Sequence, residues 1–332
     1  MKLAIFAAGT GGHIFPALSI AGQFKKEQIL FFASNRAIEK NIFKKSEFNV
    51  VHLNFSGFRG KSLTKKIFWL IKLPFILYST LNKFKEFEAD KILIMGGYIS
   101  ILGYLVSVLS KADLYIHEQN SVMGSANKIA SKRAKKIFSG FHLGVQNELH
   151  LGNPLREEFH KISYLDIPDK KNILVLGGSQ GSSFLIKNLP EAILPLSKKL
   201  KIIFQTGTND PPSIKNIEFV EFINNLPELL RSTQFIICRS GAITVAEIQA
   251  CGIPAIFIPL ENAVDNHQFL NAKEACKLGG GIVINESDFL RSDCFEKILS
   301  FSNKNMIELS KYMKKDLHLN SAKRISDEIK QD

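Results

Sequence analysis

A short pattern occurs twice in the chain, about 170 residues apart. Residues 2–8 form an apolar run that Gly9-Thr-Gly-Gly-His13 joins to a helical pattern, and residues 172–176 form another, followed by Gly177-Gly-Ser-Gln-Gly-Ser182 and a second helical pattern. Short, continuous apolar runs between helical patterns are typical of strands buried in a parallel sheet. The repeat therefore predicts two similar α/β domains, each with a glycine-rich loop at the carboxyl edge of its sheet.

The length and one dipeptide place the boundary between these domains. The chain has 332 residues, 45% of them apolar, which suffices for two domains of about 150 residues with separate cores. Asn153-Pro154 favours an extended link, because a residue before proline avoids helical backbone. We therefore predict an N-terminal domain at 1–153 and a C-terminal domain at 154–311. A last helix at about 312–332 can pack back on the first domain.

The charge indicates an anionic partner without identifying it. Lys and Arg number 43 against 31 Asp and Glu, a net charge of +12, which suits nucleic acid, a phosphorylated substrate or an anionic membrane. The four cysteines form no CxxC pair and have no evident histidine partners, so we expect reduced thiols in a cytoplasmic protein and no zinc. No apolar run reaches the roughly 18 residues that span a bilayer, which predicts a soluble or peripheral protein.

Residues 65–78 are a candidate for contact with a membrane surface. They contain the only Trp and many large apolar residues, and lysines at 65, 66, 83 and 85 border them. An apolar helix bordered by lysines suits the interface of an anionic bilayer. An ordinary core helix explains the same pattern, so both interpretations stay open.

Arg239–Gln268 carries the clearest ligand-binding pattern. An apolar strand at 234–238 leads through Ser240-Gly241 into a helix at about 242–250, and a second strand follows at 255–258. A helix that starts at the carboxyl edge of a parallel sheet favours phosphate, because its first N–H groups and its dipole face the ligand. Glu247, one turn into the helix, can accept hydrogen bonds from vicinal hydroxyls such as those of ribose. We therefore predict a site for a nucleoside diphosphate.

Polar residues at the expected edge of the first sheet indicate a second part of this site. Gly9–His13 can cradle phosphate or form only a tight turn. His13 at a helix start favours a neutral imidazole, which can act as a base at pH 7, although a structural role explains it equally well. His117-Glu-Gln-Asn120 ends a strand and contains four polar residues in succession, which is more typical of a cleft than of a core.

Several motifs together resemble a known family. They are GTGGHIFPA (9–17), GGY (96–98), HEQN (117–120), GNPLR (152–156), GGSQGS (177–182), RSGAITVAEIQACGIPAIFIP (239–259) and DNHQFLNA (265–272). In this order they resemble the two-domain GT-B glycosyltransferases, and among them the MurG family. Members of that family transfer N-acetylglucosamine (GlcNAc) from UDP-GlcNAc to undecaprenyl-pyrophosphoryl-MurNAc-pentapeptide in peptidoglycan synthesis. The resemblance implies two Rossmann-like domains whose parallel sheets face each other across a cleft.

The resemblance also implies roles for particular residues. The residues implied to bind UDP-GlcNAc are Thr10, Gly11, Gly12, Asn120, Arg156, Ser179, Ile223, Ala242, Ile243, Thr244, Val245, Ala246, Glu247 and Gln268. Gly97 and Tyr98 would bind the lipid acceptor. Two departures from the family pattern are Ile99-Ser-Ile-Leu-Gly103, in place of a Gly-Pro-rich loop, and His267, in place of glutamine.

From these roles we predict an inverting transfer in which the MurNAc 4-hydroxyl attacks the GlcNAc anomeric carbon. His13 is the first candidate for the base and Glu118 the second. No Asp-x-Asp motif ends a strand, so we expect no metal cofactor, and the diphosphate charge would be met by helix dipoles and N–H groups. We expect peripheral attachment to the cytoplasmic face of the membrane through residues 65–85, and no nucleic-acid partner. Alternatives are another GT-B UDP-sugar transferase acting on a glycolipid, a UDP-sugar epimerase and a catalytically silent nucleotide-binding subunit.

Overall fold

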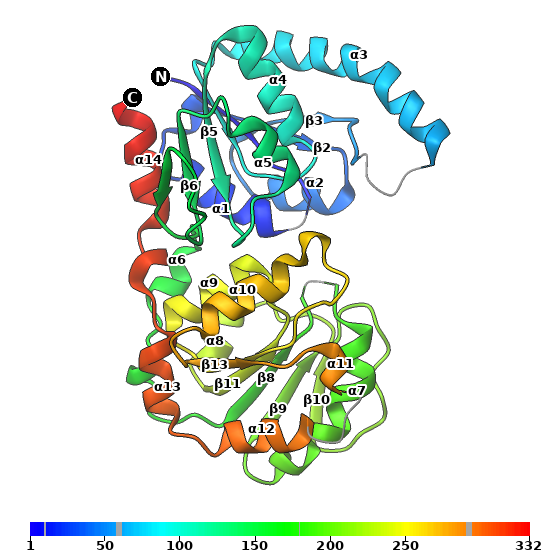
Figure 1. The fold of residues 1–332 in the computed structure, drawn as a ribbon, viewed down its shortest axis with the longest axis vertical. Coiled ribbons are helices and arrows are strands. Elements are labelled where there is room, and N and C mark those ends of the chain that lie inside the picture. The colour runs from blue at the N-terminus through cyan, green and yellow to red at the C-terminus, as the bar shows by residue number, and fades with distance from the viewer. Residues whose placement is uncertain (10, 58–61, 179, 290–293) are drawn as a thin grey trace. The chain divides into compact units, whose positions relative to one another are not determined.

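The computed structural model describes residues 1–9, 11–57, 62–178, 180–289 and 294–332, which form two compact units (Figure 1). Unit 1 comprises Met1–Leu155 together with Asn320–Asp332, and unit 2 comprises Arg156–Leu319. The sequence placed the link at Asn153-Pro154 and the returning segment at about 312. In the structure the chain enters unit 2 at Arg156 and returns to unit 1 at Asn320.

The described part of unit 1 contains a seven-stranded sheet in which all neighbouring strands are parallel. Its order is β3-β2-β1-β4-β5-β6-β7, so the first strand of the chain lies inside the sheet. Leu3 of β1 pairs with Ile29 on one side and with Lys91 on the other. The strands are β1 (Leu3–Phe6), β2 (Ile29–Ser34), β3 (Asn49–Leu53), β4 (Lys91–Ile94), β5 (Asp113–Glu118), β6 (Lys136–Ser139) and β7 (Glu148–His150).

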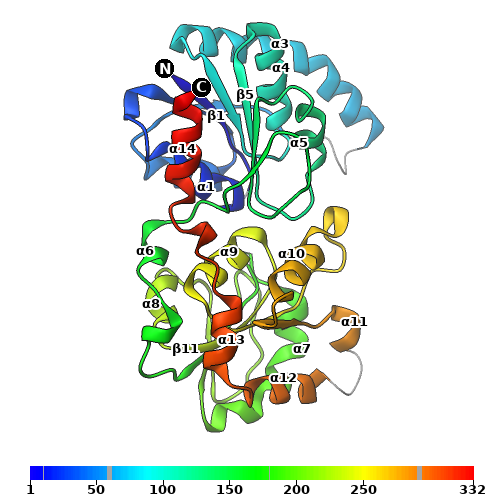
Figure 2. The same ribbon diagram turned by 60° about the vertical axis from the view of Figure 1, so that its left-hand side comes forward.

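Helices cover both faces of this sheet (Figures 1 and 2). Leu3 and Ile5 pack with buried residues of α1 (Gly11–Ala21), α2 (Ala37–Lys44) and α14 (Ser321–Gln331). Ala4 and Phe6 point to the other face and pack with residues of α3 (Leu63–Phe87), α4 (Ser100–Ser110) and α5 (Ser125–Ala130). Because β1 is buried on both faces, its sequence is a continuous apolar run.

The C-terminal helix α14 completes the first of these two layers. Ile325 and Ile329 are fully buried and pack in the same core as the buried residues of α1. Polar contacts fix the two ends of the helix: Ser321 Oγ donates to the Gly152 carbonyl at 2.8 Å, and Lys136 Nζ forms an ion pair with Glu328 at 2.8 Å. The last helix of the chain is therefore part of the core of unit 1.

Unit 2 repeats this architecture with a six-stranded parallel sheet in its described residues. The order is β10-β9-β8-β11-β12-β13, and again the first strand of the unit lies inside the sheet. The strands are β8 (Asn172–Leu176), β9 (Lys201–Gln205), β10 (Ile217–Val220), β11 (Thr233–Cys238), β12 (Ala255–Phe257) and β13 (Gly281–Val283). The helices are α6 (Glu157–His160), α7 (Ser183–Ile193), α8 (Leu226–Leu230), α9 (Ala242–Cys251), α10 (His267–Cys276), α11 (Glu286–Phe289), α12 (Cys294–Ser302) and α13 (Met306–Met313).

Four elements differ from the sequence-based expectation. The first helix begins at Gly11, within residues 9–13 that were expected to form a loop, which makes His13 the third residue of α1. The last helix, expected at about 312–332, begins only at Ser321 as α14, after Asn320, which has left-handed backbone at φ 60°. The strands β3 and β7 were not foreseen, because both lie at sheet edges and lack the continuous apolar run of a central strand.

Within the described residues, no helix combines the length and the apolarity that crossing a bilayer requires.

Candidate active site

Within each unit, the strand order brings the glycine-rich motifs of that unit to one point at the edge of its sheet. In unit 1 the connections from β1 and β4, two adjacent strands, leave toward opposite sides of the sheet, and in unit 2 those from β8 and β11 do the same. Open α/β sheets bind ligands at such switch points, outside the carboxyl ends of the strands. The described residues at these two points are 9, 11–13 and 96–98 in unit 1, and 177–178, 180–182 and 239–241 in unit 2.

In unit 2, α9 begins at the switch point with residues that leave its first turn open. Gly241 is the N-cap and has no side chain to cap the helix, and the sequence Ala242-Ile-Thr244 places no acidic side chain in the first turn. Ala242, Val245 and Ala246 are buried, whereas Ile243 and Thr244 are partly exposed. The first N–H groups of such a helix are suited to a diphosphate.

Glu247 lies in the second turn of α9 beside the entry to unit 2. Its Oε1 is 3.8 Å from Arg156 Nη2, and its side chain is 13% exposed. Burial raises the pKa of Glu247 to about 7, and the nearby Arg156 guanidinium partly opposes this shift. Arg156 is the N-cap of α6, and its guanidinium also lies over the Phe159 ring at 5.0 Å. Glu247 is therefore a carboxyl group that titrates near neutral pH.

The second glycine-rich loop is held by backbone contacts that exclude side chains. Gly181 has φ 75° and lies against the Thr206 carbonyl, so a Cβ there would collide with it. Ser182 is the N-cap of α7 and accepts a hydrogen bond from Leu185 N at 3.3 Å. The loop therefore brings bare backbone to the carboxyl end of β8.

Arg239, at the end of β11, connects four elements around this loop. It is 8% exposed, and its Nη2 donates to Ser182 Oγ at 2.7 Å and forms an ion pair with Glu286 of α11. Its Nη1 donates to the Ile258 and Pro259 carbonyls at 3.0 and 3.1 Å. No motif in the sequence singled out Arg239, although a cation directly after a buried strand is an unusual feature that could have identified it.

The start of α10 is attached to the same turn. Ser240 Oγ donates to the Gln268 carbonyl at 2.8 Å, and Asn271, which is fully buried, donates from Nδ2 to the Ser240 carbonyl at 3.2 Å. The Gln268 side chain accepts from Leu260 N at 3.1 Å. These contacts place Gln268 next to the turn before α9.

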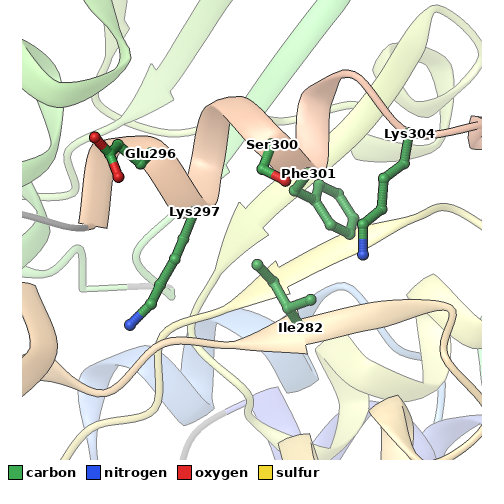
Figure 3. A pocket seen from close by; sticks show the side chains of 6 residues that line it. All are labelled: Ile282, Glu296, Lys297, Ser300, Phe301 and Lys304. Atoms are coloured by element: carbon green, nitrogen blue, oxygen red, sulfur yellow. The ribbon is translucent and has the colours of Figure 1, made fainter.

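Ile223 lies in the loop between β10 and α8 and is partly buried. The pocket of 410 Å³ in Figure 3 is elsewhere in unit 2, between α12 and β13, and contains none of the expected site residues. It is lined by Ile282, Glu296, Lys297, Ser300, Phe301 and Lys304. The expected donor residues at the β8–β11 switch point therefore lie on a different surface from this pocket.

In unit 1, His13 lies where the loops after β1, β4 and β5 meet. Its Nδ1 is 2.9 Å from Gln119 Oε1, and its Nε2 is 3.6 Å from the position of a Cβ built on Gly97. Gly97 has φ 72°, which disfavours a side chain there. Gly11 and Gly12 are the first residues of α1, and Tyr98 packs its ring at 6.0 Å from that of Phe55.

The Glu118 carboxylate is buried and hydrogen-bonded through both of its oxygens. Its Oε1 accepts from the backbone and side-chain nitrogens of Asn120 at 3.1 and 3.2 Å, and its Oε2 accepts from Gly124 N and Asn127 Nδ2 at 3.0 and 2.9 Å. The side chain is 2% exposed. Both carboxylate oxygens are thus used to organise residues 118–127.

Another buried carboxylate supports the first glycine-rich loop. Glu39 of α2 is fully buried and accepts from Gly9 N at 2.9 Å and from Ser34 N and Oγ at 2.8 and 2.7 Å. Nothing in the sequence indicated this role for Glu39, because its position in an amphipathic helix resembles that of a surface residue.

The structure thus groups the expected residues by unit. Unit 1 contains Gly11, Gly12, His13, Gly97, Tyr98, Glu118 and Asn120, whereas unit 2 contains Arg156, Ile223, Ala242–Glu247 and Gln268. Thr10 and Ser179 lie outside the described residues. Among the described residues, no group of three or more His, Cys, Asp or Glu side chains is placed to hold a metal ion.

Comparison with known proteins places the chain in a family. Residues 3–139 match the glycosyltransferase family 28 N-terminal domain and residues 172–329 match the corresponding C-terminal domain. A UDP-N-acetylglucosamine--N-acetylmuramyl-(pentapeptide) pyrophosphoryl-undecaprenol N-acetylglucosamine transferase from Vesicomyosocius okutanii is 37% identical, with 98% of this chain and 96% of the relative covered. The enzyme of that name from Wigglesworthia glossinidia brevipalpis is 35% identical, with 99% and 96% covered. The chain belongs to the MurG family of glycosyltransferases.

A solved structure agrees with this assignment. The crystal structure of MurG from Acinetobacter baumannii has a TM-score of 0.79 and 26% identity to this chain, covering 100% of this chain and 99% of that one. The expectation of two Rossmann-like α/β domains of the GT-B type is confirmed. As a member of the MurG family, the chain is a glycosyltransferase.

Proposed function

We propose that this chain transfers GlcNAc from UDP-GlcNAc to the MurNAc 4-hydroxyl of undecaprenyl-pyrophosphoryl-MurNAc-pentapeptide, converting lipid I to lipid II in peptidoglycan synthesis. The observation that carries the proposal is the near full-length identity of 35–37% to transferases with this activity in their names. The motifs that carry the resemblance also lie at the carboxyl edges of the two parallel sheets, as a sugar-nucleotide enzyme requires.

Most of the donor contacts are assigned to unit 2. The first turn of α9 faces the diphosphate with its N–H groups, and the backbone of Gly177, Gly178 and Gly181 approaches it from the end of β8. Glu247 accepts hydrogen bonds from the ribose hydroxyls, the backbone at Ile223 contacts uracil, and Gln268 contacts the GlcNAc hydroxyls. Thr10, Gly11, Gly12, Asn120, Arg156 and Ser179 are assigned to the donor as well.

The base is assigned to His13. In an inverting displacement the MurNAc O4 forms a bond to the GlcNAc anomeric carbon as the bond from that carbon to the UDP oxygen breaks. The hydroxyl proton moves to His13 Nε2, and the helix start at Ala242 stabilises the charge that develops on UDP. His13 is preferred to Glu118, because four hydrogen bonds occupy both oxygens of the Glu118 carboxylate. Gly97 and Tyr98, beside His13, are assigned to the acceptor.

The membrane surface is assigned to the exposed face of α3. Ile67, Phe68, Leu70, Ile71, Phe75 and Tyr78 are 51–75% exposed on this helix. The opposite face packs on the core through Trp69, whose Nε1 donates to the Ser56 carbonyl at 2.8 Å, and through Leu73, Ile76, Leu77 and Leu81. The helix therefore combines the two interpretations of its sequence: one face belongs to the core, and the other suits the interface of an anionic bilayer. We propose that it attaches the enzyme to the cytoplasmic face of the membrane.

One assay tests the activity. Purified chain is incubated with UDP-GlcNAc, with and without a lipid I analogue, and released UDP and the disaccharide product are measured. We expect UDP release only with the acceptor, and product carrying GlcNAc in the inverted, β configuration. Release without acceptor, or transfer only from a different UDP-sugar or to a different glycolipid, refutes the proposal. Interconversion of the free UDP-sugar would instead identify an epimerase.

A further inference from the structure

Three side chains of unit 1 form a continuous hydrogen-bonded line that ends at His13. His13 Nδ1 is 2.9 Å from Gln119 Oε1, and Gln119 Nε2 is 2.8 Å from His117 Nδ1. His117 Nε2 is 3.4 Å from the Gly152 carbonyl oxygen. Gln119 and His117 are 2% and 0% exposed, so their polar atoms depend on one another rather than on solvent.

Backbone carbonyl groups determine where the protons of this line lie. Gln119 Nε2 is also 3.3 Å from the His117 carbonyl oxygen, which can only accept, so the amide nitrogen faces His117 and the amide oxygen faces His13. Because that oxygen can only accept, the proton of the first bond is on His13 Nδ1.

The far end of the line requires the same arrangement. The Gly152 carbonyl can only accept, so His117 Nε2 is protonated and His117 Nδ1 accepts from the Gln119 amide. Burial lowers the pKa of His117 to about 4, so this ring is neutral at pH 7 and has one nitrogen free to accept. A single proton arrangement therefore satisfies every bond from Gly152 to His13.

We propose that Gln119 is a positioning residue that holds His13 in the tautomer with Nδ1 protonated and Nε2 unprotonated. The Nε2 lone pair then lies beside Gly97, 3.6 Å from the position of a Cβ on that residue. The other tautomer has its proton on Nε2 and cannot accept a hydroxyl proton there. This inference rests on the proposed role of His13 as the base, and it explains how that base is kept ready.

The tautomer can be measured without turnover. In full-length protein labelled with ¹⁵N-histidine, long-range ¹H–¹⁵N correlation spectra show which ring nitrogen is protonated, and His13→Ala assigns the His13 signals. We expect Nδ1–H in the wild type and a mixture of tautomers in Gln119→Met, which keeps the side-chain volume but removes the amide. The matched control is Gln249→Met, because buried Gln249 contacts His318 Nε2 at 3.0 Å in unit 2 and is not assigned to catalysis or binding.

Steady-state kinetics provide the second measurement. We expect Gln119→Met to lower kcat on the order of 10- to 100-fold, as the loss of a residue that orients a reacting group does. The KM for UDP-GlcNAc should change far less than kcat, because the Gln119 side chain itself is not assigned to the donor. Gln249→Met should lower the melting temperature but change neither kcat nor the His13 spectrum.

The outcomes separate this inference from the proposed function. An Nε2–H tautomer in the wild type, or Nδ1–H retained in folded Gln119→Met, overturns the role of Gln119. An unchanged kcat in a variant with mixed tautomers also overturns it when His13→Ala is inactive. Full activity of His13→Ala instead refutes the base assignment, whatever the tautomer is. The wild-type spectrum alone remains decisive if Gln119→Met does not fold.

Discussion

Glu247 provides the sharpest test of the donor site, because burial raises its pKa to about 7 and places its titration in the accessible pH range. An ionised carboxylate can accept hydrogen bonds from both ribose hydroxyls, whereas a protonated carboxyl uses part of its capacity as a donor. Above pH 7 the group is mainly ionised and below pH 7 mainly protonated. We therefore expect the affinity for UDP to rise with pH through this range.

The size of the effect follows from the titration. With a pKa of about 7, the ionised fraction rises from about one in eleven at pH 6 to about ten in eleven at pH 8. If the ionised form carries the contact, the Kd for UDP falls about tenfold between these pH values, which is about 1.4 kcal/mol. Glu247→Gln lacks the charge and should bind UDP at pH 8 at least about tenfold more weakly than the wild type, since a hydrogen bond to a charged group contributes about 1.5–3 kcal/mol.

Calorimetric titration of UDP at pH 6, 7 and 8 measures this dependence. Titration of the UDP phosphate contributes equally to all proteins, so the informative quantity is the difference between wild type and Glu247→Gln. Glu308→Gln, which neutralises an exposed carboxylate on α13, is the matched control and should behave as the wild type does. If Glu247→Gln keeps the wild-type affinity and pH dependence, the ribose assignment of Glu247 is wrong.

Three further predictions concern other parts of the chain. His13→Ala should lower kcat on the order of 10²- to 10⁴-fold and leave UDP affinity unchanged, and equal losses in both would make His13 a binding residue. The double change of Phe68 and Phe75 to Ser should lower the affinity for anionic vesicles, measured by co-sedimentation, more than tenfold without changing the melting temperature. The reason is that burial of each ring in the bilayer interface contributes on the order of 2 kcal/mol to binding. Leu278→Ser, at an exposed leucine of unit 2, should bind vesicles as the wild type does. Arg239→Gln should lower the free energy of unfolding by about 3–5 kcal/mol in denaturant titration, because it leaves the Glu286 carboxylate, whose side chain is only 13% exposed, without its partner. A change below about 1 kcal/mol would show that the network around Ser182 does not depend on Arg239.

The sequence was informative where a local pattern had a single physical cause. The strand at 172–176 was predicted at its observed bounds, because it is buried on both faces and its sequence is a continuous apolar run. The edge strands β3 and β7 escaped detection, since partial exposure breaks the apolar run. The last helix was predicted from about 312, whereas α14 begins at Ser321, because the left-handed backbone of Asn320 interrupts a segment whose composition suits a helix on both sides.

The candidate site shows the same division. The motifs alone were sufficient to indicate a sugar-nucleotide transferase and to select His13, Glu247 and the start of α9, because glycine loops and helix starts express their chemistry locally. The environments of these residues depend on contacts between distant segments: the pKa of Glu247 on its burial, and the orientation of His13 on Gln119, 106 positions away. Glu118 shows the difference most clearly, because the sequence makes it a candidate base while in the structure four hydrogen bonds occupy both oxygens of its carboxylate. The sequence by itself determined the two α/β domains and the class of ligand, since strand burial and phosphate binding follow local patterns. Only the tertiary structure decided which polar groups remain available for chemistry, because hydrogen-bond partners are chosen by proximity in space.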